Sequence, residues 1–528
     1  MKKYSTVFGI IFMFVLVMAF AVVFAACGET PDTRNYFIVR FDKNNSDPDG
    51  TEAVPRTKNV FNSPWMIDEL PKQPTRVGYV FIEWNKDKNG DGEEFIAITP
   101  VGEDVTVYAQ WEEGAVTVSE PGVRTIPFPS LEEALDSITT TGVYTVRVNS
   151  DQSIAKRTFS GAELNVTIEA MPGREVVINF AGAVVEGSIF IVNNGASLTL
   201  GDGITLDGQS KTGYGVVVNG SGTSFTMNGG TIKGYSGTNS AGVSVANNGK
   251  FTMNGGTING NTASNGGGVY NDAEFIMNGG TINGNTAIGD GGGVYNLGEL
   301  TMNGGTISGN TASNGGGVYV YGSTVFKMNG GAISGNTSDN SGGGVYNQGN
   351  FTMDGAETAI SGNNANSPVV GKGGGGVYSP GTFTMENGII SGNTTNSDGG
   401  GVNVTYDIIP GSFSMKNGFI SDNNAVKGGG VYSSREFFME NGTINGNKAS
   451  GIGGGGVYVD GGTFIKADGI ITGNDGFDPT LSGNVADSGD GHAVYADKST
   501  LRWRDRTVTG PIDASSDEVE DWDYIDIE

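Results

Sequence analysis

The feature that most constrains how this chain can fold is an internal repeat of about 25 residues. The phrase Phe-Thr-Met-Asn-Gly-Gly-Thr-Ile, or a close variant of it, begins at Phe225, Phe251, Phe275, Leu300 and Phe326. More degenerate copies begin at Phe351, Phe383, Phe413, Phe437 and Phe464, and most copies end with Gly-Gly-Val-Tyr or a variant. A repeat of about 20–50 residues is typical of solenoids, in which each copy contacts only the copies beside it.

Each copy contains three short segments with the alternating pattern of β-strands, separated by turns rich in Gly and Asn. The few apolar side chains of one copy cannot offset the entropy lost in ordering about 25 residues. A copy is therefore stable only when its backbone pairs with the copies above and below it. We expect an all-β fold, in which residues 126–510 form a right-handed parallel β-helix of about a dozen coils with three strands per coil.

A short amphipathic helix is expected at the entrance to the β-helix. Residues 130–138 begin with a capping box, formed by Ser130 and Glu133, and continue with apolar residues at helical spacing. Such an N-terminal helix would cap the open apolar end of the solenoid. We expect residues 114–125 to be a linker and residues 511–528 to be an acidic C-terminal tail.

One asparagine recurs at the same turn of successive copies. Stacked amides at such a turn can form a hydrogen-bonded ladder along the solenoid axis, which suits an inward-facing or bend position. We expect this ladder to comprise Asn261, Asn285, Asn310, Asn336, Asn363, Asn393, Asn423, Asn447 and Asn474.

A tyrosine follows the valine at the end of most copies, and strand alternation turns it outward if the valines face the core. Five such residues fall on consecutive coils: Tyr270, Tyr295, Tyr319, Tyr346 and Tyr378. The row lapses at Asn403 and resumes at Tyr432. Two interpretations are open. The rings either stack on one another and stabilise the sheet, or form a recognition stripe for a glycan or a partner protein.

The N-terminal segment has the pattern of a secretory signal. Two lysines precede an uncharged apolar run, which ends in small residues directly before Cys27, the only cysteine of the chain. Residues 1–26 resemble a bacterial lipoprotein signal peptide, which implies that Cys27 is lipidated and anchors the protein to a membrane. Residues 27–33 are then the anchor linker, and Gly28 favours the outer membrane. The alternative is an ordinary signal peptide in which Cys27 has no part.

Residues 34–113 form a separate small module. They contain Leu-Pro, Pro-Thr-Arg-x-Gly-Tyr-x-Phe-x-x-Trp and Asp-Val-Thr-Val-Tyr-Ala-Gln-Trp, in that order. This combination resembles the internalin-type B-repeat, or Listeria–Bacteroides repeat, and implies a small β-grasp-like fold that serves bacterial surface proteins as a spacer or binding module. Residues 87–92 open like a calcium loop, but Ile98 occupies the position that needs Glu, so we interpret them as a hairpin turn.

The solenoid copies also resemble a known family. The tetrapeptides Phe225–Asn228 and Gly229–Ile232, with their later copies, are similar to the repeats of polymorphic outer membrane proteins, bacterial surface adhesins with a pectin-lyase-like β-helix. The resemblance covers the β-helix alone and implies adhesion by analogy. Those proteins end in a membrane domain, which the acidic residues 513–528 do not resemble.

Composition narrows the function further. Lys and Arg total 30 against 57 Asp and Glu, and the net charge of −27 argues against nucleic acid as a partner. With one cysteine and one histidine, we expect no metal and no cofactor. The sequence thus predicts a non-enzymatic lipoprotein of the cell envelope, exposed on the outer membrane, whose β-helix adheres to a host or bacterial surface protein or glycan.

The alternative is a pectin-lyase-like enzyme that degrades polysaccharides. The segment from Asp490 to His492 resembles the Gly-His segment of polygalacturonases. These residues, however, occupy the place of the glycines that precede Val-Tyr in other copies, which favours drift of the repeat over catalysis. Two acidic residues on neighbouring coils beside a basic residue, in a groove, would favour the enzyme.

The lipid anchor is directly testable. The substitution Cys27→Ser removes the sulfur to which the lipid would be attached, so we predict loss of acyl labelling and transfer of the protein from the detergent phase to the aqueous phase. Phase partitioning and metabolic labelling measure both effects. A Cys27→Ser protein that still partitions with the membrane after signal cleavage contradicts the anchor.

Overall fold

The computed structural model describes residues 35–513 of the 528-residue chain. The description has gaps at 47–49, 62–64, 77–78, 122–124, 182–187, 238–241, 407–410, 452, 474–482, 488–492, 498–499, 504–505 and 510–511. The signal segment, Cys27, Asn474, Asp490 and His492 therefore lie outside the described residues. The chain forms two units, of which the smaller ends at Trp111 and the larger continues from Glu112. No helix among the described residues is long and apolar enough to cross a membrane.

The small unit is a four-stranded sheet with the strand order β2-β1-β4-β3. Its strands are β1 (Phe37–Asp42), β2 (Thr57–Val60), β3 (Tyr79–Asn85) and β4 (Val105–Glu113). β2 pairs antiparallel with β1, and β4 pairs parallel with β1. Phe41, Trp84 and Phe95 are the largest side chains of its separate core. Asn85 and Glu94 pair antiparallel across residues 87–92, as expected for a hairpin turn.

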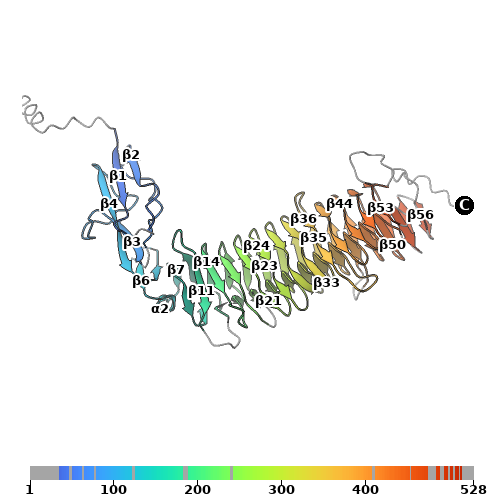
Figure 1. The fold of residues 1–528 in the computed structure, drawn as a ribbon, viewed down its shortest axis with the longest axis horizontal. Coiled ribbons are helices and arrows are strands. Elements are labelled where there is room, and N and C mark those ends of the chain that lie inside the picture. The colour runs from blue at the N-terminus through green and yellow to red at the C-terminus, as the bar shows by residue number, and fades with distance from the viewer. Residues whose placement is uncertain are drawn as a thin grey trace, which may run out of the picture. The chain divides into compact units, whose positions relative to one another are not determined.

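The larger unit is a parallel β-solenoid whose coils stack side by side (Figure 1). One representative coil contains β22 (Val269–Asn271), β23 (Glu274–Met277), β24 (Thr281–Asn283) and β25 (Thr286–Ala287). Each of these strands pairs parallel with its equivalent in the next coil. We call the four resulting sheets the tyrosine, phenylalanine, isoleucine and alanine sheets, after a residue of each strand in this coil.

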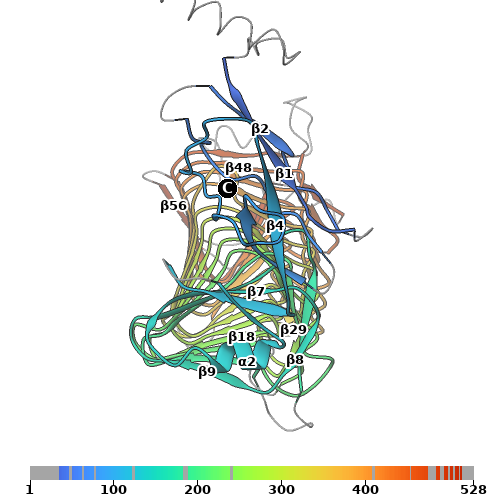
Figure 2. The ribbon, with the colours of Figure 1, turned by 90° about the vertical axis from the view of Figure 1, so that its left-hand side faces the viewer.

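Three of the sheets extend along almost the whole solenoid, and successive coils lie behind one another in the view along it (Figure 2). The phenylalanine sheet runs from β7 (Gly142–Val148) to β55 (Thr500–Trp503), and the isoleucine sheet runs from β8 (Gln152–Ile154) to β52 (Ile470–Ile471). The tyrosine sheet runs from β9 (Arg157–Ser160) to β54 (Val494–Asp497). The alanine sheet is shorter and runs from β21 (Thr262–Ala263) to β53 (Val485–Ala486).

The all-β solenoid class is as predicted, but the expectation of three strands per coil is wrong over the region that the alanine sheet spans. The fourth strand is only two residues long in most of these coils, for example β25 and β49 (Lys448–Ala449). Two residues are too few to show an alternating pattern in the sequence. The second residue of each of these two-residue strands is buried and faces inward, as Ala365 and Ala425 do.

The interior is one continuous core of repeated side chains. Valines of the tyrosine sheet, Phe and Met of the phenylalanine sheet and Ile of the isoleucine sheet are almost completely buried. Neighbouring phenylalanine rings from Phe326 to Phe464 stack with their centroids 4.7–4.8 Å apart. Since rows of aromatic and branched side chains pack well across paired strands, the repeat stabilises itself at every coil.

The N-terminal end of the solenoid differs from the expected helical cap. The helix α2 (Leu131–Asp136) has six residues, and the predicted Ser130 side chain accepts a hydrogen bond from the Glu133 N–H. Its buried residues join the core, but the strand edge of β7 is covered by β5 (Val116–Ser119), which pairs antiparallel with it. β5 lies in the segment expected to be a linker, so the solenoid begins earlier than predicted.

The C-terminal end is covered in a similar way. β56 (Arg506–Thr509) pairs antiparallel with β55, and β57 (Ile512–Asp513) pairs antiparallel with β54. β57 lies in the segment expected to be an acidic tail. Antiparallel strands at both ends of the phenylalanine sheet, and at the C-terminal end of the tyrosine sheet, occupy backbone groups that an open sheet edge would present to other chains.

The predicted asparagine ladder is present and completely buried. From Asn261 to Asn447, each Nδ2 donates a hydrogen bond to the Oδ1 of the next asparagine over 2.9–3.0 Å. The same Oδ1 also accepts the backbone N–H of the preceding rung, as Asn336 does from Asn310. The rung after Asn447 is Asn484 rather than the expected Asn474, because this coil has additional residues before the turn.

We predict that removing one rung strongly destabilises the solenoid. The substitution Asn336→Ala leaves the Asn310 amide groups without their acceptor in a buried place. Each buried polar group without a partner costs about 1–3 kcal/mol, so the free energy of unfolding should fall by about 3 kcal/mol. Urea denaturation followed by far-ultraviolet circular dichroism measures it.

Asn329→Ala is the matched control. Asn329 also donates from Nδ2 to the Oδ1 of an asparagine one coil away, Asn303, over 3.0 Å, but this bond is exposed to water. We expect a change below about 1 kcal/mol, because water replaces the lost partner. Equal losses in the two variants would show that burial of the ladder does not determine its contribution.

Candidate functional site

The predicted tyrosine row lies on the outer face of the tyrosine sheet. Its members belong to β22, β26 (Val294–Asn296), β30 (Val318–Val320), β34 (Val345–Asn347) and β38 (Val377–Ser379). The valine before each tyrosine is fully buried in the core, so alternation turns the ring away from the core. The five rings form one stack in which neighbouring centroids are 4.7–5.4 Å apart.

Most of this row is not open to solvent. Tyr319, Tyr346 and Tyr378 are only 6%, 7% and 0% exposed and form a small apolar cluster of their own. Each ring of this cluster packs against its neighbours in the row, and Tyr319 lies between Tyr295 and Tyr346. The stacking interpretation therefore accounts for these three rings.

The accessible part of the row is its N-terminal end. Tyr270 and Tyr295 are half-buried. Tyr321, two residues after Tyr319 in the sequence, is 50% exposed. The Tyr321 ring centroid lies 6.5 Å from that of Tyr295. We call Tyr270, Tyr295 and Tyr321 the tyrosine patch. Sequence analysis missed Tyr321, although the alternation Val-Tyr-Val-Tyr at 318–321 places it on the same face.

The environment of the patch is acidic and partly desolvated. Burial, with a smaller contribution from the Asp290 carboxylate, raises the pKa of Tyr295 to about 12. The same two causes raise the pKa of Tyr319 still further. Burial also raises the pKa of Asp290, although its hydrogen bond from Asn314 Nδ2, 2.9 Å long, opposes this. Protonated phenols therefore persist well above neutral pH.

The lapse at Asn403 is a polar, charged interruption of the stack. Asn403 is fully buried and donates from Nδ2 to the backbone oxygen of Asp398 over 2.9 Å. The Asp398 carboxylate is also buried and accepts the Gly371 N–H over 2.8 Å, and burial raises its pKa. The backbone of Asp398 forms a parallel β-bridge with that of Lys427 on the next coil.

The rings that border this interruption are held by charged side chains. Lys372 Nζ donates to the Tyr378 hydroxyl over 2.7 Å, and the Tyr432 hydroxyl donates to Asp460 Oδ2 over 2.7 Å. Sequence reasoning found Asn403 and Tyr432 but none of the charged residues, because a charged side chain stands at these positions in only some of the copies. Among the described residues, no group of three or more His, Cys, Asp or Glu side chains could hold a metal ion.

Comparison with known proteins informs only the small unit. Residues 37–110 match the family model of the Listeria-Bacteroides repeat domain, in agreement with the resemblance of residues 34–113. No curated protein and no solved structure matched the chain. The matched segment ends before the solenoid, so the function of the solenoid must be argued from its own surface.

The buried phenols predict a loss of stability at high pH. Because the pKa of Tyr295 is about 12 in the folded protein and about 10 in an unfolded chain, the unfolded state releases the proton first. The stabilisation from the protonated phenol is present in full below about pH 10 and is lost as the pH rises toward about 12. Urea denaturation across this range measures the decline.

A double variant, Tyr295→Phe with Tyr319→Phe, serves as the control because it keeps the ring stack and removes both hydroxyls. We expect a shallower decline of the free energy of unfolding above about pH 10 than in the parent. Identical declines in the parent and the double variant would contradict the assigned pKa increase.

Proposed function

We propose that this protein is a lipid-anchored component of the cell envelope that binds a partner on a host or bacterial surface through the tyrosine patch, without catalysis. The observation that carries the proposal is the patch itself. Tyr270, Tyr295 and Tyr321 place accessible rings on a sheet whose strands are fixed by in-register pairing. Rigid amphipathic rings of this kind are enriched at protein interfaces and also suit the faces of sugars.

Two further observations support presentation at a surface. The Listeria-Bacteroides repeat match precedes the solenoid, and the resemblance of residues 34–113 implies a spacer or binding module of bacterial surface proteins. In the sequence, the expected signal and the proposed anchor at Cys27 come before that module, and the solenoid comes after it. The proposed order is lipid, spacer and solenoid, with the outer membrane as the site of attachment.

The polysaccharide-degrading alternative has one point in its favour. Asp398 and Lys427 lie on neighbouring coils, and Asp460 is close enough to Asp398 to raise its pKa. Asp398 is only 2% exposed, however, and its carboxylate already holds the Gly371 N–H. A general base must reach the proton that it removes from a substrate, so binding is the better-supported role.

We predict that the double substitution Tyr270→Ser with Tyr321→Ser abolishes adhesion. The purified full-length protein is screened against a glycan array and immobilised matrix proteins, and the affinity for the best ligand is compared between parent and variant. Truncating aromatic anchors at an interface costs about 2 kcal/mol or more, so binding should weaken at least about 30-fold.

Tyr406→Ser is the matched control, because Tyr406 is another exposed tyrosine, 56% exposed, which packs on the Arg435 guanidinium outside the patch. It should bind as the parent does. Equal binding by the parent and a folded Tyr270→Ser, Tyr321→Ser variant contradicts the patch. Cleavage of a polyuronate by the parent, measured in the same preparations, would instead favour the enzyme.

A further inference from the structure

A second surface lies along the edge where the phenylalanine sheet turns into the isoleucine sheet. It carries five exposed asparagines on consecutive coils: Asn228, Asn254, Asn278, Asn303 and Asn329. From Asn254 onward, each Nδ2 donates to the Oδ1 of the preceding asparagine over 2.8–3.0 Å. A side-chain amide has two N–H groups and two acceptor positions. An asparagine with a neighbour on each side in this row therefore keeps one N–H group and one acceptor position for a ligand. We call this row the outer ladder.

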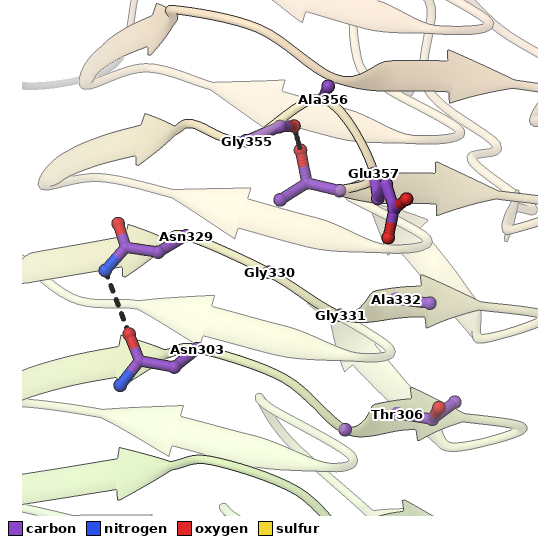
Figure 3. Close-up of a pocket in the computed structure, with 11 residues that line it drawn as sticks. Asn303, Thr306, Asn329, Gly330, Gly331, Ala332, Gly355, Ala356 and Glu357 are labelled. Carbon is purple, nitrogen blue, oxygen red and sulfur yellow. Dashed lines mark hydrogen bonds between the residues drawn. The ribbon is translucent and has the colours of Figure 1, made fainter.

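The outer ladder ends at a step that the sequence creates. In the coil after Asn329, Asp354 replaces asparagine and the turn is two residues longer, because Asp-Gly-Ala-Glu-Thr-Ala stands where other copies have Asn-Gly-Gly-Thr. A shallow depression of about 570 Å³ lies in front of this step, and Glu357 stands at its margin (Figure 3). Asn303, Thr306, Asn329, Ala332 and Thr358 line it.

The floor of the depression is bare backbone. A Cβ at Gly330 would collide with the Asn303 carbonyl oxygen, so no side chain can stand between the outer ladder and the first residues of the isoleucine strands. Figure 3 shows Asn303 and Asn329 on one side of this floor and Thr306 and Ala332 on the other. A ligand lying here can approach the amides without an intervening side chain.

Beyond the step, the same surface becomes apolar. Ala332 pairs in register with Ala359, Ala359 with Ile389, and Ile389 with Phe419. Ile389 and Phe419 are 37% and 49% exposed. The row that contains Thr306 and Ala332 therefore continues, coil by coil, into an exposed aliphatic and aromatic platform. The asparagine row beside it continues as Asp354, Glu386 and Lys416.

We infer that this edge binds an extended, neutral polysaccharide whose chain runs along the solenoid axis. Coils are spaced by about 4.8 Å, so the outer ladder offers one amide per coil to a polymer of regularly spaced hydroxyl groups. Phe419 offers its ring to the apolar face of a sugar. Asp354, Glu357 and Glu386 repel a polyanion, and the Lys416 ammonium is paired with the Glu386 carboxylate over 2.8 Å.

This inference is independent of the proposed function. The edge lies between the phenylalanine and isoleucine sheets, whereas the tyrosine patch lies on the tyrosine sheet, and the two surfaces share no residue. A failure at one surface therefore leaves the other untouched.

The test measures binding of the full-length protein to hexasaccharides of cellulose, xylan and mannan by isothermal titration calorimetry, with polygalacturonate as the charged comparison. We expect binding of at least one neutral hexasaccharide and none of polygalacturonate. Asn303→Ala with Asn329→Ala, and separately Phe419→Ala, should each weaken it by about tenfold or more, which corresponds to about 1.4 kcal/mol.

Two variants serve as controls for these substitutions. Asn424→Ala changes an exposed asparagine of the alanine sheet, and Tyr406→Ser changes an exposed tyrosine outside both proposed surfaces, so both should bind the neutral sugar as the parent does. Circular dichroism confirms that each variant is folded. The inference is overturned if no neutral hexasaccharide binds at millimolar concentration, if polygalacturonate binds better, or if Tyr321→Ser abolishes binding while Phe419→Ala does not.

Discussion

In-register pairing between identical positions of successive coils is the constraint on which the rest of this structure depends. Phe251 pairs with Phe275 and Tyr295 pairs with Tyr319, so every position of the repeat becomes a continuous row of like side chains. A row can persist only if its side chain is a suitable neighbour for itself. Phenylalanine rings stack, and an amide can donate to the next amide, whereas a row of like charges would repel.

The two asparagine ladders show how burial decides what such a row does. The Oδ1 of Asn285 accepts both the backbone N–H and the Nδ2 of Asn261, while its own Nδ2 donates to Ile258 and Asn310. Every hydrogen-bonding position of this amide is used, which makes the inner ladder structural. In the outer ladder, an amide spends one donor and one acceptor on its neighbours and keeps the others facing water.

How much could be predicted from the sequence follows from the same geometry. The solenoid, the buried asparagine ladder and the outward turn of the tyrosines follow from the repeat of about 25 residues and from the alternation of apolar and polar residues. Both patterns can be read directly in the sequence. The alanine strands could not be predicted, because Thr262–Ala263 is too short for a pattern. The burial of Tyr346 and Tyr378 also escaped prediction, because alternation shows that the rings face away from the core but not what surrounds them there. The charged residues around Asn403 escaped prediction because a charged side chain stands at their positions in only some of the copies.

Specific recognition requires that the repeat be broken. A row of identical side chains presents the same groups at every coil and so cannot fix where along the solenoid a ligand binds. Departures from the repeat distinguish one coil from the next. Tyr321 extends the aromatic row sideways, and the two additional residues before Thr358 end the outer ladder at a step. Because these departures leave the inner ladder and the phenylalanine stack intact, the fold tolerates them without loss of register. Regular rows thus hold the scaffold, and the interruptions on its outer face give each of the two proposed binding surfaces its location.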